Sequence, residues 1–310
     1  MKAPMPWFGG KSVVAPEVWA RIGRTDNYVE PFCGSCALLL ANPHPAKTET
    51  VNDADAWLAN FWRASRADPE RVAQWADYPV SEVDLLARYR WLFYRQEAKQ
   101  FQERMKADPD YFDAKSAGWW LWGICAWIGS GWGQAASPER HLPHLGDAGR
   151  GINRKLPHLG DAGRGARYAY ILSQMTAIAD RLRDTRVACG DWRRVLGPSV
   201  TEKHGMTAVL LDPPYADAEH SIRYAGGGLV WEEVCAWAES NGANPLLRIA
   251  LFGYAGTWAA PAEWRTVSWK AHGGMATRNG KGKANGRRET IWFSPACLPA
   301  GLDFGTGEAA

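Results

Sequence analysis

Short apolar runs typical of buried β-strands occur at both ends of this chain, and segments with helical periodicity separate them. Near the amino terminus, an extended run at 27–32, a small-residue turn at 33–35 and a helix at 36–41 form a strand–turn–helix unit. A second short strand ends at Asn52-Asp53. Later strands are predicted at 186–189, 207–211, 247–252 and 290–293. Strands separated by helices predict an α/β fold with a parallel sheet.

The middle of the chain has helical rather than strand patterns. Apolar residues recur at helical spacing over 57–62, and the pattern from Pro69 to Met105 is helical throughout. The expected apolar face of the latter includes Val83, Leu86, Tyr89 and Phe93. The run Trp119–Ile128 is too short to span a membrane and predicts a buried helix whose tryptophans belong to the core. With 310 residues, the chain has room for about two domains, or for one α/β domain with a large insertion.

Composition narrows the class of protein further. Hydrophobic residues at 46% and charged residues at 22% exclude a wholly disordered, collagen-like or coiled-coil chain. The first residues contain no continuous apolar core, so we expect no secretory signal and a cytoplasmic location. The six cysteines lie among apolar neighbours and are expected to be reduced thiols. Only Cys33 and Cys36 lie close together; too few further ligands are present for a zinc site, and a redox pair is the weaker alternative.

The most specific motif is Asp212-Pro213-Pro214-Tyr215, which directly follows the apolar run 208–211. A carboxylate at the carboxyl end of a parallel strand points into the crevice where α/β sheets bind ligands. The prolines fix the backbone and leave the carbonyl of Pro213 free to accept a hydrogen bond. Together with the Tyr215 ring, these acceptors suit a planar group that carries an NH2.

The order of motifs resembles the Dam-type, alpha-class N6-adenine DNA methyltransferases. Trp7-Phe8-Gly9-Gly10-Lys11 is similar to that family's amino-terminal motif, and Glu30-Pro31-Phe32-Cys33-Gly34-Ser35 to its cofactor turn. Asn52-Asp53 is similar to its acidic ribose-binding strand end. Cys189-Gly190-Asp191-Trp192 lies where the family has Asp-Phe, so Trp replaces Phe but keeps a ring. The middle of the chain resembles the family only in its position.

The resemblance implies a Rossmann-like methyltransferase sheet that uses S-adenosylmethionine and releases S-adenosylhomocysteine, without a metal. It implies Asp212, Pro213, Pro214 and Tyr215 as catalytic residues. The residues implied to bind the cofactor are Trp7, Lys11, Glu30, Phe32, Gly34, Asp53, Asp191, Trp192 and Asp212. Physical reasons support some of these roles, because an acid after the second strand can accept hydrogen bonds from ribose hydroxyls, and Gly34 permits close approach of the backbone.

Basic residues concentrate around a duplicated segment, since LPHLGDAGRG at 142–151 recurs identically at 156–165. Long loops of this kind tend to be functional, although a duplicated surface loop with no role is the alternative. A second basic cluster lies at 270–288. Arginine and lysine on such loops can reach phosphates and base edges. The predicted DNA-binding residues are Arg140, Arg150, Arg154, Lys155, Arg164, Arg167, Arg278 and Lys281.

Together with these observations, the resemblance implies an inserted target-recognition domain, mainly helical and looped, at 63–185. The catalytic domain is expected to comprise 1–62 and 186–298, and 299–310 to form a flexible tail. The expected reaction is methylation of a flipped-out adenine at N6 in double-stranded DNA, by a monomer or a homodimer and without a membrane. The alternatives are another planar amine, in cytosine, RNA adenine or a protein amide, and a non-catalytic DNA-binding protein on the same scaffold.

Overall fold

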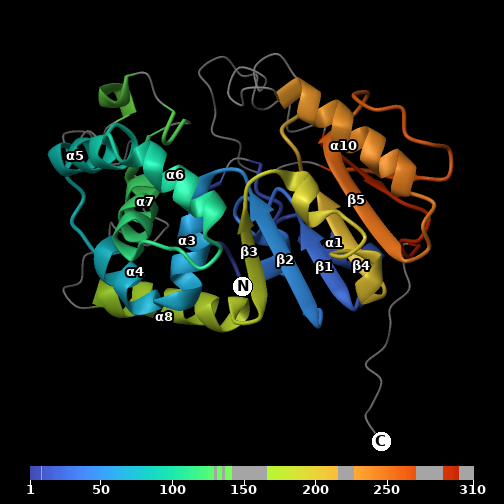
Figure 1. Ribbon diagram of the computed structural model, residues 1–310, viewed down its shortest axis with the longest axis horizontal. Coiled ribbons are helices and arrows are strands. Elements are labelled where there is room, and N and C mark those ends of the chain that lie inside the picture. Colours follow the sequence, from blue (N-terminus) through green and yellow to red (C-terminus); the bar gives the residue numbers. More distant parts are fainter. Residues whose placement is uncertain are drawn as a thin grey trace, which may run out of the picture. The chain divides into compact units, whose positions relative to one another are not determined.

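The computed structural model describes residues 1–7, 9–128, 131–134, 137–141, 166–215, 227–269 and 289–299. Within this part of the chain, seven strands form one mixed sheet in the order β3-β2-β1-β4-β5-β7-β6 (Figure 1). The expected α/β class is confirmed. The strands are β1 (Asn27–Glu30), β2 (Thr48–Asp53), β3 (Thr185–Cys189), β4 (Thr207–Leu211), β5 (Leu247–Tyr254), β6 (Arg265–Ser268) and β7 (Glu289–Phe293).

The sheet is parallel in its centre and antiparallel at one edge. Strand β4 pairs in parallel with both β1 and β5, whereas β7 pairs antiparallel with both β5 and β6. The prediction of a parallel sheet is therefore wrong for β7. A parallel connection needs a long crossover that is usually a helix, and the sequence between β6 and β7 is rich in glycine and basic residues without helical periodicity. Strand β6 was not predicted from the sequence, because it is short and has no buried residue.

The helices are separate and mostly short. They are α1 (Ala15–Ile22), α2 (Ala37–Leu40), α3 (Ala56–Ala67), α4 (Pro69–Ala76), α5 (Glu82–Phe93), α6 (Ala98–Ala107), α7 (Ala114–Ala126), α8 (Ala166–Leu182) and α10 (Gly227–Asn241). The 3-10 helices are η1 (Pro138–His141), η2 (Trp192–Val195) and η3 (Glu202–His204).

The continuous helical pattern predicted from Pro69 to Met105 is wrong, because this segment forms three helices. Pro79 disfavours a continuous helix after α4, and the side chain of Ser81 accepts a hydrogen bond from the backbone N–H of Asp84 to start α5. The expected face of α5 is confirmed at Tyr89 and wrong elsewhere. Val83 is 78% exposed, and the buried residues are Leu85, Arg88, Tyr89 and Leu92.

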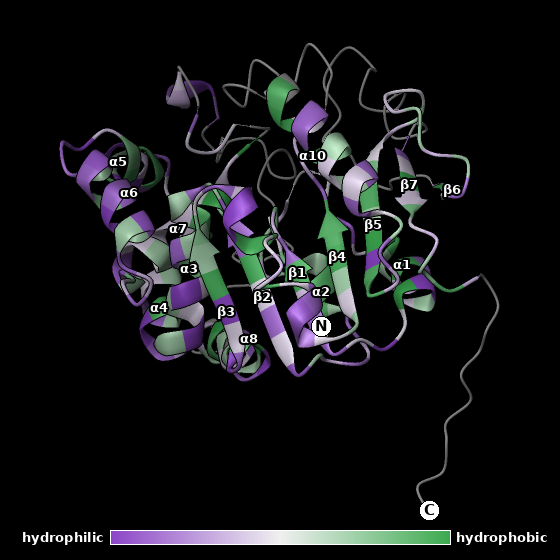
Figure 2. Ribbon diagram, turned by 45° about the vertical axis from the view of Figure 1, so that its right-hand side comes forward, coloured by the Kyte–Doolittle hydropathy of each residue, from purple (hydrophilic) through white to green (hydrophobic). Residues whose placement is uncertain are grey.

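Contacts divide the chain into two compact units. The first unit comprises Met1, 11–50 and 193–310, and the second comprises 2–10 and 51–192. In the first unit, α1 and α10 both contact β5, and every residue of β4 is buried. Figure 2 shows β4 as a strongly hydrophobic strand, which agrees with a central position in the sheet.

In the second unit, α3, α4, α7 and α8 pack on one another. Trp62, Trp120 and Trp122 are among its largest fully buried side chains. The expected core role is confirmed for Trp120, Trp122 and Trp127, whereas Trp119 is only half-buried beneath the Lys115 ammonium, 4.5 Å from its ring centroid. The six cysteines are all free and buried, as expected of reduced thiols. Among the described residues, no helix combines the length and the apolar character that crossing a membrane requires.

Candidate active site

Asp212 directly follows β4, between the carboxyl ends of the parallel strands β1 and β5. Its side chain is 26% exposed, so the carboxylate remains accessible to a ligand. Pro213 is buried and Pro214 half-buried, and neither can extend the strand pairing through an N–H. The structure therefore presents the carboxylate at the edge of the sheet where the sequence predicted it.

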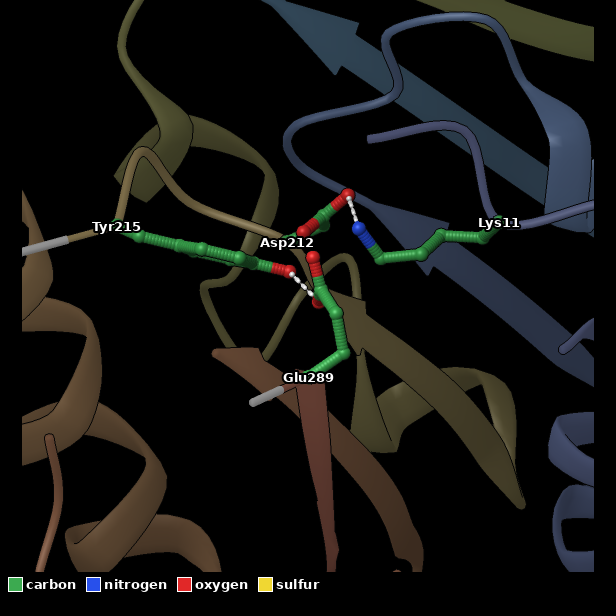
Figure 3. A network of polar contacts seen from close by, with 4 residues as sticks. All are labelled: Lys11, Asp212, Tyr215 and Glu289. Carbon is green, nitrogen blue, oxygen red and sulfur yellow. Dashed lines mark hydrogen bonds and ion pairs between the residues drawn. The ribbon is translucent and has the colours of Figure 1, made fainter. Parts of the chain in front are cut away.

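Lys11 pairs with this carboxylate. Its ammonium Nζ lies 2.8 Å from Asp212 Oδ2, and the Lys11 side chain is only 5% exposed (Figure 3). The ammonium also lies 5.4 Å from the centroid of the Tyr215 ring and 5.3 Å from that of Phe252. Lys11 is thus a buried component of the Asp212 cluster and not a solvated surface lysine.

Tyr215 is held by an acid that the sequence analysis missed. The Tyr215 hydroxyl donates a hydrogen bond to Glu289 Oε2 over 3.0 Å, and Glu289 is the first residue of β7 (Figure 3). Burial raises the pKa of Tyr215 well above its ordinary value, and the carboxylates of Asp212 and Glu289 raise it further. The phenol therefore stays protonated and remains a donor. The only signal in the sequence was an acid opening the apolar run 289–293.

The turn after β1 forms another part of the same sheet edge. Strand β1 ends at Glu30, two residues earlier than expected, because Pro31 lacks a backbone N–H. Glu30 is buried and accepts a hydrogen bond from the Tyr28 hydroxyl over 2.7 Å. Gly34 has a φ of 45°, a conformation that suits glycine. Phe32 and Gly34 are half-exposed, so this turn offers both a ring and an accessible backbone.

In the second unit, the end of β2 joins the turn after β3. The Asn52 side chain donates to the carbonyl of Gly190 over 3.0 Å, and the Gly190 N–H donates to the carbonyl of Asp53 over 3.0 Å. Asp53 is half-buried and Asp191 is exposed. These bonds hold the two loops together, and each loop carries a carboxylate that can accept hydrogen bonds.

The rings that the sequence predicted to contact the cofactor differ in exposure. Trp192 is 6% exposed. Trp7 is half-exposed, and its ring centroid lies 6.3 Å from that of Trp120. Phe8, within the same motif, lies outside the described residues.

Most of the predicted DNA-binding residues lie outside the described part of the chain. Arg140 is exposed in η1, and the backbone of Arg167 belongs to α8. Two contacts hold η1 in place. Glu139 Oε1 lies 3.1 Å from the Arg90 guanidinium, and the His141 ring stacks on Trp127 with the ring centroids 4.7 Å apart. The predicted residues outside the described ranges are Arg150, Arg154, Lys155, Arg164, Arg278 and Lys281.

Residues 7–115 match the model of a family described as D12 class N6 adenine-specific DNA methyltransferase. The match covers about a third of the chain and shows that this part is similar to the family. The matched segment contains the amino-terminal motif, the turn after β1 and the end of β2, and it stops before Asp212. The Asp-Pro-Pro-Tyr motif is therefore an indication independent of the match. No curated protein matches the chain.

The match supports an adenine-specific DNA methyltransferase and suggests DNA as the substrate. It favours adenine over the cytosine, RNA and protein acceptors, and an enzyme over a non-catalytic DNA-binding protein. The seven-stranded, mostly parallel sheet is compatible with a Rossmann-like methyltransferase.

Proposed function

We propose that the enzyme transfers the methyl group of S-adenosylmethionine to N6 of an adenine flipped out of duplex DNA. The cluster of Asp212, Lys11 and Tyr215 carries this proposal, because a half-exposed carboxylate beside a fixed ring suits a planar group bearing NH2. An adenine stacked in a duplex cannot enter such a site, so the base has to leave the stack, which costs on the order of a few kcal/mol. Single-molecule sequencing of DNA from cells expressing the chain tests the proposal, and unmodified adenines throughout would contradict it.

Catalysis in this proposal is mainly positioning. The Asp212 carboxylate and the Pro213 carbonyl accept the two amine hydrogens and direct the nitrogen lone pair away from conjugation with the base. The two prolines restrict the backbone between these acceptors. The hydroxyl of Tyr215 is engaged by Glu289, so Tyr215 contributes the face of its ring to the base. On methyl transfer, N6 would gain a bond to the methyl carbon as the carbon–sulfur bond of the donor breaks, and N6 would then release one proton to solvent.

S-adenosylmethionine supplies an electrophilic methyl group on a sulfonium and leaves as S-adenosylhomocysteine. The residues present fit this ligand. In the first unit, the left-handed Gly34 allows close backbone approach, and Glu30, Phe32, Lys11 and Asp212 are proposed contacts. In the second unit, Asp53 and Asp191 supply acceptors for hydroxyl groups. Trp7 and Trp192 remain proposed contacts on the basis of the family resemblance. The proposed transfer requires no metal.

Loss of the Asp53 carboxylate should weaken cofactor binding. Isothermal titration in the absence of DNA should show that S-adenosylmethionine and S-adenosylhomocysteine both bind the wild-type chain. Asp53→Ala should weaken both about tenfold or more, because one or two charge-assisted hydrogen bonds of about 1.5–3 kcal/mol are lost. Asp53→Asn is the more conservative variant. The Asp53 side chain also accepts a hydrogen bond from the Asp55 N–H, and an amide oxygen can retain that bond.

Asp180→Ala is a matched control for this titration, because Asp180 is an exposed acid of α8 whose side chain pairs with Arg183. Its affinity for both ligands should equal that of the wild-type chain. If neither ligand binds the wild-type chain at any reachable concentration, S-adenosylmethionine is not its methyl donor.

Target recognition is proposed for residues 63–185, with catalysis in 1–62 and 186–298 and a tail at 299–310. The proposed recognition region lies within the range 51–192 of the second unit. The composition of its duplicated segment supports contact with DNA, because basic side chains outnumber acids in it. Arg140 and Arg167 flank the duplicated segment. We propose that they contact DNA together with the basic residues of this segment and of 270–288.

Deletion of residues 152–165 removes one copy of the duplicated segment and keeps the other in frame. We expect lost or relaxed site-specific methylation, with cofactor affinity retained. If Arg150 or Arg164 contacts a base, its replacement by Ala should cost about 1–3 kcal/mol and relax the site at one position. Replacement of Arg154 or Lys155, if it contacts phosphate, should weaken binding to all sequences alike and reduce the salt slope by about one unit. An unchanged methylation pattern in the deletion variant would leave the segment without a role in recognition.

A further inference from the structure

Glu289 is a buried acid at the candidate active site that the proposed chemistry does not use. It is 6% exposed and lies at the start of β7, paired in register with Tyr254 of β5. A buried carboxylate is costly unless it is hydrogen-bonded, and the Tyr215 hydroxyl supplies one such bond. The bond links the motif after β4 to a strand 74 residues later in the chain.

The Tyr215 ring also packs against two other aromatic rings. Its centroid lies 4.6 Å from that of Tyr254 and 6.2 Å from that of Trp231 of α10, and both pairs are T-shaped. Gly253 makes room for Trp231, because a Cβ at this position would collide with the indole. The ring position is thus fixed by aromatic packing and by a hydrogen bond at its hydroxyl end.

The two carboxylates beside Tyr215 differ in exposure and in partner. The Asp212 side chain is 26% exposed and pairs with the Lys11 ammonium, whereas Glu289 is buried and accepts from a neutral phenol. Figure 3 shows Lys11 and Tyr215 approaching the two carboxylates from opposite sides. This arrangement leaves Asp212 available to an incoming amine and directs Glu289 toward the ring.

We propose that Glu289 is a positioning residue, which holds the Tyr215 ring through its hydroxyl in the orientation that receives the methyl-accepting base. This inference rests on the proposed function, in which the ring face stacks on that base. A ring ordered before the base arrives loses less conformational freedom on binding, and the benefit extends to the transition state. Glu289 acts through Tyr215 and has no direct contact with the base in this proposal.

A double-mutant cycle in methyl transfer to duplex DNA tests the inference. Tyr215→Phe and Glu289→Ala should each lower kcat/KM about 10- to 100-fold, as expected for the loss of one hydrogen bond to a charged group. The double variant should be no slower than the slower single variant, since both remove the same bond. Glu289→Gln should restore most of the activity, because its amide oxygen still accepts from the hydroxyl.

A second measurement makes no use of DNA. In protein with 13C-labelled tyrosine rings, the Tyr215 signal should be single and sharp in the wild-type chain and in Glu289→Gln, and broadened or shifted in Glu289→Ala. Losses that multiply in the double variant, wild-type turnover by Tyr215→Phe, or a Tyr215 signal indifferent to position 289 would each overturn the inference. A wild-type chain that keeps the Glu289-dependent Tyr215 signal but methylates no adenine would contradict the proposed function and leave the positioning role intact.

Discussion

Asp212→Ala should lower methyl transfer about a hundredfold to a thousandfold, the loss typical of removing one preorganised polar group from a reaction centre. The wild-type carboxylate is half-exposed at the end of β4 and held by Lys11, so the proposed amine would meet an acceptor that is already oriented. Duplex affinity should change little, because the proposed DNA contacts lie in other segments. Single-turnover methylation, measured beside a duplex-binding titration, separates the two effects.

Asp212→Asn provides the matched variant. It keeps an acceptor oxygen in place but removes the charge that pairs with Lys11, so its rate should lie between those of Asp212→Ala and the wild-type chain. Near-normal turnover by Asp212→Ala would exclude the proposed mechanism.

Arg63→Ala should cost about 3–5 kcal/mol of the free energy of unfolding, as expected when a buried, fully hydrogen-bonded charge is removed. Arg63 of α3 is 3% exposed, and burial lowers the pKa of its guanidinium. It donates to the backbone carbonyls of Val187, Met105, Asp108 and Tyr111 at 2.9–3.3 Å. All four acceptors lose this donor in the variant. Urea unfolding followed by tryptophan fluorescence measures the loss.

Arg66→Ala is the control on the same helix, since Arg66 is less buried and its guanidinium bonds the single carbonyl of Thr185 over 2.7 Å. Its cost should be about 1 kcal/mol. Arg63→Lys should also destabilise the second unit, because a single ammonium cannot reproduce the planar fork of donors. Equal losses for Arg63→Ala and Arg66→Ala would show that the four-carbonyl arrangement contributes nothing specific.

The sequence was sufficient for features that depend on neighbouring residues. The strand, turn and helix that run from Asn27 to Leu40 follow from local apolar patterns and small residues. The position of Asp212 follows from the apolar run 208–211 before it. The end of α4 and the start of α5 are also marked by nearby residues, Pro79 and Ser81. They were overlooked because the apolar spacing suggested one continuous helix.

Features that depend on pairing between distant residues were not predictable from a single sequence. The lysine of the amino-terminal motif was singled out, but its ion pair with Asp212 joins residues that are far apart in the sequence. Glu289 was not predicted as a site residue, because its partner Tyr215 lies 74 residues away in the sequence. A single acid at the start of an apolar run does not by itself indicate a functional site. The antiparallel direction of β7 likewise depends on which strand it adjoins, and local apolarity does not encode this.

The pairing of β1 with β4 imposes an order on folding during synthesis. The paired residues Asn27 and Thr207 are 180 residues apart in the sequence. At ordinary elongation rates, β1 waits on the order of 10 to 40 s for β4 to leave the ribosome. The whole of 51–192 emerges in that interval and can fold first. Leu38 and Leu39 of α2, buried in the finished protein, meanwhile have no completed sheet to cover them. The first unit is therefore the part of the nascent chain that most needs protection from aggregation.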